Sequence, residues 1–143
     1  MINKHAALYE WLAKCPLLPD TLIASFLNER DGSVAVTPIS NPTYIKRYLR
    51  GRGIMQYEFA VSVMLSFSDS TDETNTNNLF LVHTLQEWLR EQEKLSNYPD
   101  FGADCSDYQL EVLSDMPQLA EKYQNGMAKY QFYATLKYFY EGD

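Results

Sequence analysis

The residues of this chain that could do chemistry are few and lie far apart. His5 falls at the edge of the apolar stripe of a helix-like segment, and His83 lies on the polar face of another. Cys15 and Cys105 form no CxxC pair and show no Cys/His spacing of a metal site. We therefore expect boundary or surface histidines, rather than metal ligands or general bases, and two small buried thiols.

The sequence has none of the short motifs that bind phosphate groups or present a nucleophile. The GRG triplet at positions 51–53 is too short for a phosphate-binding loop, and no GxxxxGKS/T, GxGxxG or GxSxG pattern occurs. Asp69, Asp72 and Glu73 lie in the polar run SDSTDETNTNN, which lacks the turn-forming glycine of a calcium-binding loop. We expect a solvated loop here, with a specific partner contact as the alternative. The sequence predicts no enzyme, no metal site and no cofactor.

One cluster of positive charge stands out against an acidic background. The segment YIKRYLRGRG carries Lys46, Arg47, Arg50 and Arg52, a third of the 12 basic residues of the chain. It falls in a long connection between two predicted strands. This connection is either a solvated loop that wraps the sheet edge or a binding loop. A binding loop would dock on an acidic surface, such as the 69–73 loop of a neighbouring copy, or touch passing DNA.

The composition excludes several classes of protein. With 143 residues and 45% hydrophobic content, the chain can build one core, and we expect one domain over residues 1–143. A net charge of −7 and a pI of about 4.8 argue against a protein that coats nucleic acid, because phosphate binding needs a basic surface. Charged residues interrupt every apolar stretch, so we expect no membrane span and a cytoplasmic protein.

Hydrophobic periodicity predicts the elements that must position these residues. Residues 3–14 form an amphipathic helix, and residues 20–32 fit either a helical turn or a short strand. The apolar side of the first helix holds Leu8, Trp11, Leu12 and Cys15. Residues 33–39 and 56–68 alternate as strands, the second with a wet face and a buried face that holds Phe59 and the other odd-numbered residues from 57 to 67. Residues 79–95 form a long amphipathic helix with Leu95 on its apolar side and Gln86 on its polar face, and the preceding Thr and Asn residues offer an N-cap.

The C-terminal part completes a sheet. Residues 108–115 alternate as a further strand, and Asn125-Gly126 predicts a type I′ hairpin turn within residues 118–140. On the returning strand of this hairpin, one face holds Phe132, Ala134, Leu136, Tyr138 and Tyr140. The order of elements indicates an α+β fold, an antiparallel four-stranded sheet with two main helices packed on one face.

The second face of this sheet has a mixed character. Ala60, Met64, Tyr133 and Phe139 are interspersed there with serine, threonine and lysine. Aromatic and small polar residues together are typical of protein interfaces, since tyrosine gives a large contact area at little entropic cost. Tyr133 and Phe139 are therefore candidate partner-binding residues, and a monomer with scattered surface aromatics is the alternative. A free sheet edge that pairs with another chain would be a direct route to a ring.

Three blocks of the sequence, taken together, resemble the minor capsid or tail-terminator family of bacteriophages with long tails. They are GSVAVTPISNPTYIKRYLRGRGIMQYEFAVSVML, NNLFLVHTLQEWLREQEKLSNYPDFG and MAKYQFYATLKYFY, in that order, and they span most of residues 31–140. The resemblance is one of pattern and carries no catalytic signature.

The resemblance implies a non-enzymatic α+β subunit that forms a ring, expected to be a hexamer, at the head-proximal end of the tail tube. Such a ring stops tube polymerisation and provides the head-docking surface, in the virion and, during assembly, in the host cytoplasm. The implied partners are sister copies, the tail tube protein and the head–tail connector, contacted by the sheet surfaces and by loops at residues 46–52 and 69–73. DNA would pass through without tight binding, because an acidic lumen repels phosphates.

Two alternatives stay open at this point. The first is a head–tail joining stopper or tail-completion subunit, which can share a similar small α+β fold and ring. The second is a small monomeric α+β adaptor or binding protein.

Overall fold

The computed structural model describes residues 3–18, 22–24, 32–67, 72–113, 117–123 and 126–142. Over these residues the chain is α+β, as the sequence predicts. The elements in order are α1 (Lys4–Leu12), β1 (Leu22–Ala24), β2 (Val34–Pro38), β3 (Thr43–Arg47), the short 3₁₀ helix η1 (Leu49–Gly51), β4 (Gly53–Ser66), α2 (Asp72–Lys94), β5 (Cys105–Val112), β6 (Gln118–Lys122) and β7 (Met127–Tyr140).

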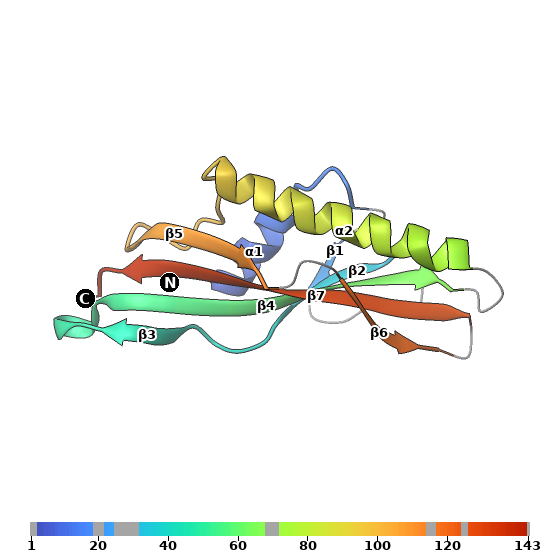
Figure 1. The fold of residues 1–143 in the computed structure, drawn as a ribbon. Helices are drawn as coiled ribbons and strands as arrows, with labels where there is room; N and C mark the ends of the chain where they lie inside the picture. The colour runs from blue at the N-terminus through green and yellow to red at the C-terminus, as the bar shows by residue number, and fades with distance from the viewer. Residues whose placement is uncertain are drawn as a thin grey trace.

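Two long strands form the centre of the sheet (Figure 1). β4 and β7 pair antiparallel along their whole length, from Gly53 opposite Tyr140 to Ser66 opposite Met127. Along the outer edge of β4 lie β2 and β3, and along the outer edge of β7 lie β5 and β6, all antiparallel to the strand they pair with. β1 adds to β2 in parallel, over three residues.

The sheet of the described residues thus has seven strands, and the predicted four are too few. β1 is only three residues long, and its segment fitted strand and helix equally well from the sequence. β3 is exposed along all five of its residues, so it lacks the alternation of apolar and polar positions that identifies a half-buried strand.

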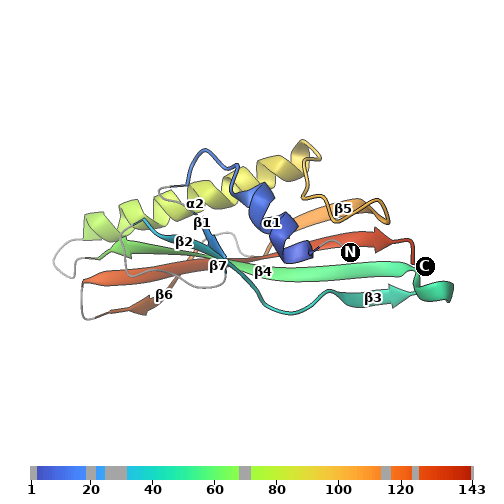
Figure 2. The ribbon, with the colours of Figure 1, turned by 180° about the vertical axis from the view of Figure 1, so that it is seen from behind.

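The helices and the sheet share one hydrophobic core. α2 runs along the sheet with α1 beside it (Figures 1 and 2). The buried side chains of both helices belong to one cluster with the sheet residues predicted to face inward, which include Phe59, Phe132 and Leu136. As predicted, Leu8, Trp11, Leu12 and Cys15 of the N-terminal segment are buried.

The long helix departs from its predicted pattern at three places. α2 begins at Asp72, so the polar run predicted as a solvated loop is helical from that residue onward. Acidic residue types are favoured in the first turn of a helix by the macrodipole, which explains how a polar run can start one. Asp69 lies outside the described residues. Gln86, expected on the polar face, is 0% exposed, whereas Leu95, expected on the apolar side, is 65% exposed, one residue past the end of the helix.

The second face of β4 is not the wet face that the alternation predicts. Ala60, Ser62 and Met64 are buried within the single chain. Their cross-strand partners on β7 are Tyr133, Gln131 and Lys129, in that order. Directly opposed side chains of antiparallel strands lie within contact distance, so long side chains on β7 can cover short ones on β4. Burial on this face therefore depends on which residues of β4 and β7 lie opposite each other, and the sequence of one strand does not reveal this pairing.

The C-terminal hairpin forms as predicted. β6 and β7 pair, the Gly126 N–H donates to the Tyr123 carbonyl over 3.3 Å, and the Tyr123 N–H donates to the Met127 carbonyl over 2.8 Å. Gly126 has a positive φ of 80°. Asn125 lies outside the described residues, so the type I′ turn stays a prediction.

Candidate interaction surface

Residues 43–52, which we call the basic arm, form a hairpin extension on β4 at the end of the sheet where the chain ends (Figure 1). The positions predicted as a loop are instead strand and 3₁₀ helix: Lys46 and Arg47 end β3, and Arg50 lies in η1. β3 pairs with β4 from Thr43 opposite Gln56 to Arg47 opposite Gly53, with a bulge at Ile45. The backbone that carries Lys46 and Arg47 is therefore paired with a central strand.

Two hydrogen bonds and a tight turn close the arm on itself. The Tyr44 hydroxyl donates to the Gly51 carbonyl at 2.6 Å, and the Tyr48 N–H donates to the Arg52 carbonyl at 2.6 Å. Arg50 and Gly51 turn the chain with positive φ values of 65° and 74°. Past the turn, a side chain on Gly53 would collide with the Lys46 carbonyl oxygen, so the two limbs approach each other more closely than any other residue type would permit.

The arm and the residues before it concentrate exposed apolar side chains. Five of the eleven large hydrophobic residues that are exposed in the described part of the chain fall within residues 39–49. Leu49 is 88% exposed, Ile45 50% and Tyr48 43%. Single exposed apolar residues are normal on a protein surface, whereas a group held on one rigid element marks an interaction site.

The cations of the arm lie against aromatic rings. The Arg47 guanidinium lies 4.9 Å from the centre of the Tyr44 ring, and the Lys46 ammonium lies 5.4 Å from that of Tyr48. The side-chain ion pairs in the described part of the chain join Glu87 to His83 and Arg90, so none neutralises the arm. A surface of apolar, aromatic and unneutralised basic side chains resembles the composition of protein interfaces, where tyrosine and arginine are enriched.

The two aromatic residues predicted to bind partners lie in different places. Phe139 is next to the arm, with the Arg52 guanidinium 5.7 Å from its ring centre. Tyr133, which is 38% exposed, lies six residues earlier on the same strand, which is about 20 Å away at the rise of an extended chain. The structure therefore adds Phe139 to the basic arm and leaves Tyr133 apart from it.

Two of the three predicted acidic residues lie in a described element, and that element is far from the arm. Asp72 and Glu73 stand at the start of α2, at the opposite end of the sheet from the arm (Figure 1). The sequence analysis identified the cations of the arm, but it missed Ile45, Tyr48 and Leu49. Their spacing of three and four residues is that of an amphipathic helix, so the sequence pattern alone would have placed them on a buried helix face rather than on an exposed arm.

A cavity of about 780 Å³ lies between the start of α1 and the paired ends of β4 and β7. In its wall His5 Nδ1 lies 3.0 Å from the Tyr57 hydroxyl. Burial lowers the pKa of His5 below its usual 6.5 and raises the pKa of Tyr57 to about 12, so both are neutral at pH 7. The His5 Nε2 and Tyr138 hydroxyl atoms are buried and have no hydrogen-bond partner among the described residues. A ligand in the cavity cannot contact these shielded atoms unless the wall moves.

The other groups with chemical potential are embedded in the fold. Burial raises the pKa of the Cys105 thiol to about 11, which keeps it protonated and unreactive. His83 Nε2 lies 3.5 Å from Glu87, a contact that the i, i+4 spacing in the sequence would have predicted. Over the described ranges, no group of three His, Cys, Asp or Glu side chains is arranged to bind a metal ion, and no helix is long and apolar enough to cross a bilayer.

Comparison with known proteins adds no family to this description. No protein-family model matches the chain, and no curated protein matches its sequence.

Proposed function

We propose that this chain is a non-enzymatic structural subunit that assembles with copies of itself into a ring, and that it acts as a tail terminator of a phage or prophage virion. The basic arm carries the proposal. It is a rigid element whose exposed side chains include Leu49 and Ile45, beside four cations without an acidic partner in the described part of the chain. Such a surface gains free energy when another protein covers it.

The fold supports an assembling subunit in a second way. If both helices pack on one face of the sheet, the arm and the sheet edges remain accessible to partners. In this arrangement α1 and α2 build the core, and the β3 edge meets a sister copy or the tube. The burial of Ala60, Ser62 and Met64 shifts the expected contact from the middle of the second sheet face to the arm.

The acidic charge of the subunit fits a channel that releases DNA. With a net charge of −7, a ring of copies whose lumen shares this sign would repel phosphates and let a duplex slide. Tight duplex binding at low salt would contradict this part of the proposal.

Two other functions use the same surface differently. A stopper or tail-completion subunit would also form a ring but would bind on the portal side. A monomeric adaptor would use the arm to hold a different protein. The exposed apolar residues of the arm favour a permanent contact over either a solvated loop or a transient one.

The test is assembly followed by end-capping. Sedimentation velocity across a range of concentrations, with and without a polymerising phage tail tube protein, should show a closed oligomer, alone or on tube ends. Electron microscopy should show tubes of limited length with a ring at one end. A strict monomer in both conditions would favour the adaptor, and a ring that leaves tube growth unchanged would favour the stopper.

A further inference from the structure

The basic arm has an acidic counterpart across the same end of the sheet. There the strands run in the order β3, β4, β7, β5, so β3 and β5 form opposite edges. Four strands at the usual spacing place these edges about 14 Å apart. The two edges therefore face in opposite directions and can be used at the same time.

The two edges carry charge of opposite sign. The basic arm, residues 43–52, carries four basic residues and no acidic one, whereas β5 carries two acidic residues and no basic one. These two are Asp107 and Glu111, and both are exposed. The acidic segment thus complements the arm in sign, at an edge the arm of the same chain cannot reach.

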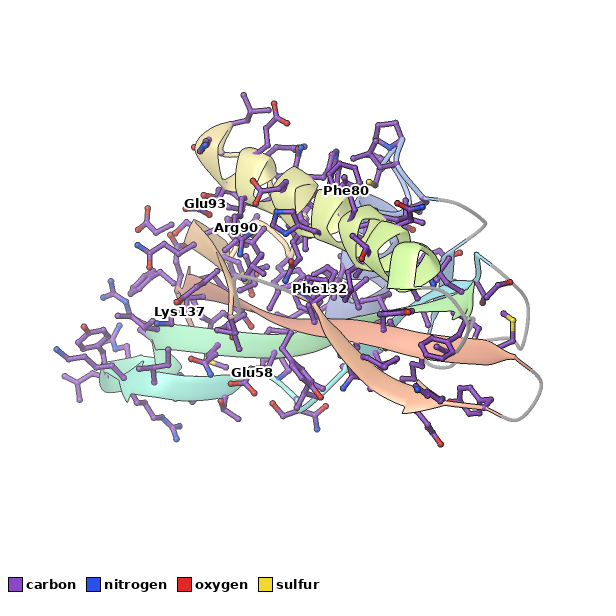
Figure 3. All side chains as sticks on the ribbon, turned by 45° about the vertical axis from the view of Figure 1, so that its right-hand side comes forward. Glu58, Phe80, Arg90, Glu93, Phe132 and Lys137 are labelled. Carbon is purple, nitrogen blue, oxygen red and sulfur yellow. The ribbon has the colours of Figure 1, made fainter. Side chains whose placement is uncertain are left out.

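The acidic edge includes a recess of about 240 Å³, which is lined by Glu93, Gln109, Leu110, Glu111 and Lys137. Figure 3 shows Glu93 near the end of α2, above Lys137 on the sheet. Glu93 Oε2 already accepts the Leu110 N–H at 2.6 Å, and the Tyr98 hydroxyl at 2.8 Å, which fixes its carboxylate. Because a carboxylate offers about four acceptor positions, Glu93 can still receive a donor from outside.

Resting on the proposed self-assembly, we propose that the basic arm of one copy docks on the β5 edge of the next copy, with a cation of the arm entering the recess between Glu93 and Glu111. The opposite arrangement, two β3 edges paired with each other, would bring two sets of four cations together and is repelled. The contact is therefore head-to-tail. A head-to-tail contact repeated by a closing rotation generates a ring.

Charge reversal on each edge tests this contact. The arm variant is Lys46→Glu with Arg50→Glu, and the edge variant is Gln109→Lys with Glu111→Lys. All four residues are exposed or at the strand edge, so both variants should fold. The matched control, Lys14→Glu with Lys94→Glu, makes the same change in net charge as the arm variant at two exposed positions outside the arm and β5.

The arm variant and the edge variant should each need a protein concentration at least tenfold higher than the wild type needs to assemble. The control should assemble at the concentration of the wild type. An equimolar mixture of the two variants should regain assembly, because each reversed surface then meets a surface of opposite sign. A variant that had merely lost stability would not be rescued by mixing. If the wild type assembles and both variants assemble equally well, the head-to-tail contact is wrong and the proposed ring function stands. If the wild type is monomeric alone and on tubes, both proposals are wrong.

A cross-link gives a second readout that does not depend on charge. Ile45→Cys in one population and Gln109→Cys in another should form a disulfide-linked heterodimer on mixing, since Cys15 and Cys105 are buried and will contribute little. Ile45→Cys alone should give few homodimers. Efficient homodimers from Ile45→Cys alone would show two arms in contact and overturn the proposal.

Discussion

At the end of the sheet that carries the arm, the two edge strands, β5 and β3, differ in how far their backbone is covered. On β5 an outward backbone N–H, that of Leu110, is occupied by the Glu93 carboxylate, and α2 packs over the strand. On β3 all five residues are exposed, and in the described part of the chain this strand pairs only with β4. An edge strand that is left open is a risk of uncontrolled pairing, so natural proteins cover it or charge it. Here the β5 edge is covered by α2 and its Glu93 carboxylate, and the β3 edge is left uncovered but carries cations.

This difference teaches which edge contributes side chains to the core. The β5 edge contributes Leu110 and Cys105, whereas β3 contributes no buried residue. Removing the buried side chains of β5 should therefore affect folding, whereas removing side chains of β3, or the exposed ones of β5, should affect assembly.

The largest effect is expected from truncating one side chain on each edge. Leu110→Ala, at 7% exposure, should lower the free energy of unfolding by about 2–5 kcal/mol, because it leaves a cavity in the core. Ile45→Ala should change it by less than about 0.5 kcal/mol, because the side chain is half exposed. Urea denaturation followed by tryptophan fluorescence measures both. Equal losses at the two positions would contradict the division between edges.

Uncovering the protected edge should have the next largest effect. Glu93→Gln replaces a charged acceptor of the Leu110 N–H and the Tyr98 hydroxyl with a neutral one and should cost about 1–3 kcal/mol. Glu91→Gln, at an exposed position two residues earlier on α2, serves as the control and should be nearly neutral. Thermal unfolding monitored by circular dichroism separates the two. If Glu93→Gln and Glu91→Gln unfold at the same temperature, the hydrogen bonds of the Glu93 carboxylate do not contribute to stability.

Detaching the arm should have a smaller effect on stability. Gly53→Ala places a methyl group against the Lys46 carbonyl and should separate β3 from β4, at a cost of about 1 kcal/mol. Amide hydrogen exchange should then accelerate in residues 43–47 and stay slow in the central strands. The control Ser40→Ala, at an exposed position before the arm, should leave exchange unchanged. Faster exchange across all of β4 would show that the arm is part of the cooperative core.

The smallest change is expected from salt. If the arm binds an acidic surface, raising the ionic strength from about 0.05 M to 0.5 M shortens the screening length severalfold and should weaken assembly, while the unfolding midpoint of the monomer changes little. Sedimentation at the two salt concentrations measures assembly, and thermal unfolding measures the midpoint of the monomer. Assembly that strengthens with salt would point to the apolar side chains of the arm as the dominant contact.

Much of the fold could be predicted because periodicity reports burial. The inward alternation of β4 and β7 is confirmed, from Tyr57 to Leu65 and from Phe132 to Tyr138. The α+β class and the existence of both helices follow from the same signal, although α2 begins at Asp72, before the apolar pattern starts. The prediction of a single domain over residues 1–143 stays a prediction, as do the ring and the tail-terminator function.

The sequence by itself determined which residues are charged and which strands have an apolar face, because these depend on residue type and spacing along one chain. Only the tertiary structure decided that Lys46 and Arg47 lie on an edge strand, that Tyr133 is separated from Phe139, and that a basic edge and an acidic edge flank one end of the sheet. These relations depend on strand register and strand order. Contacts between segments far apart in the sequence set both, and no local pattern encodes such contacts.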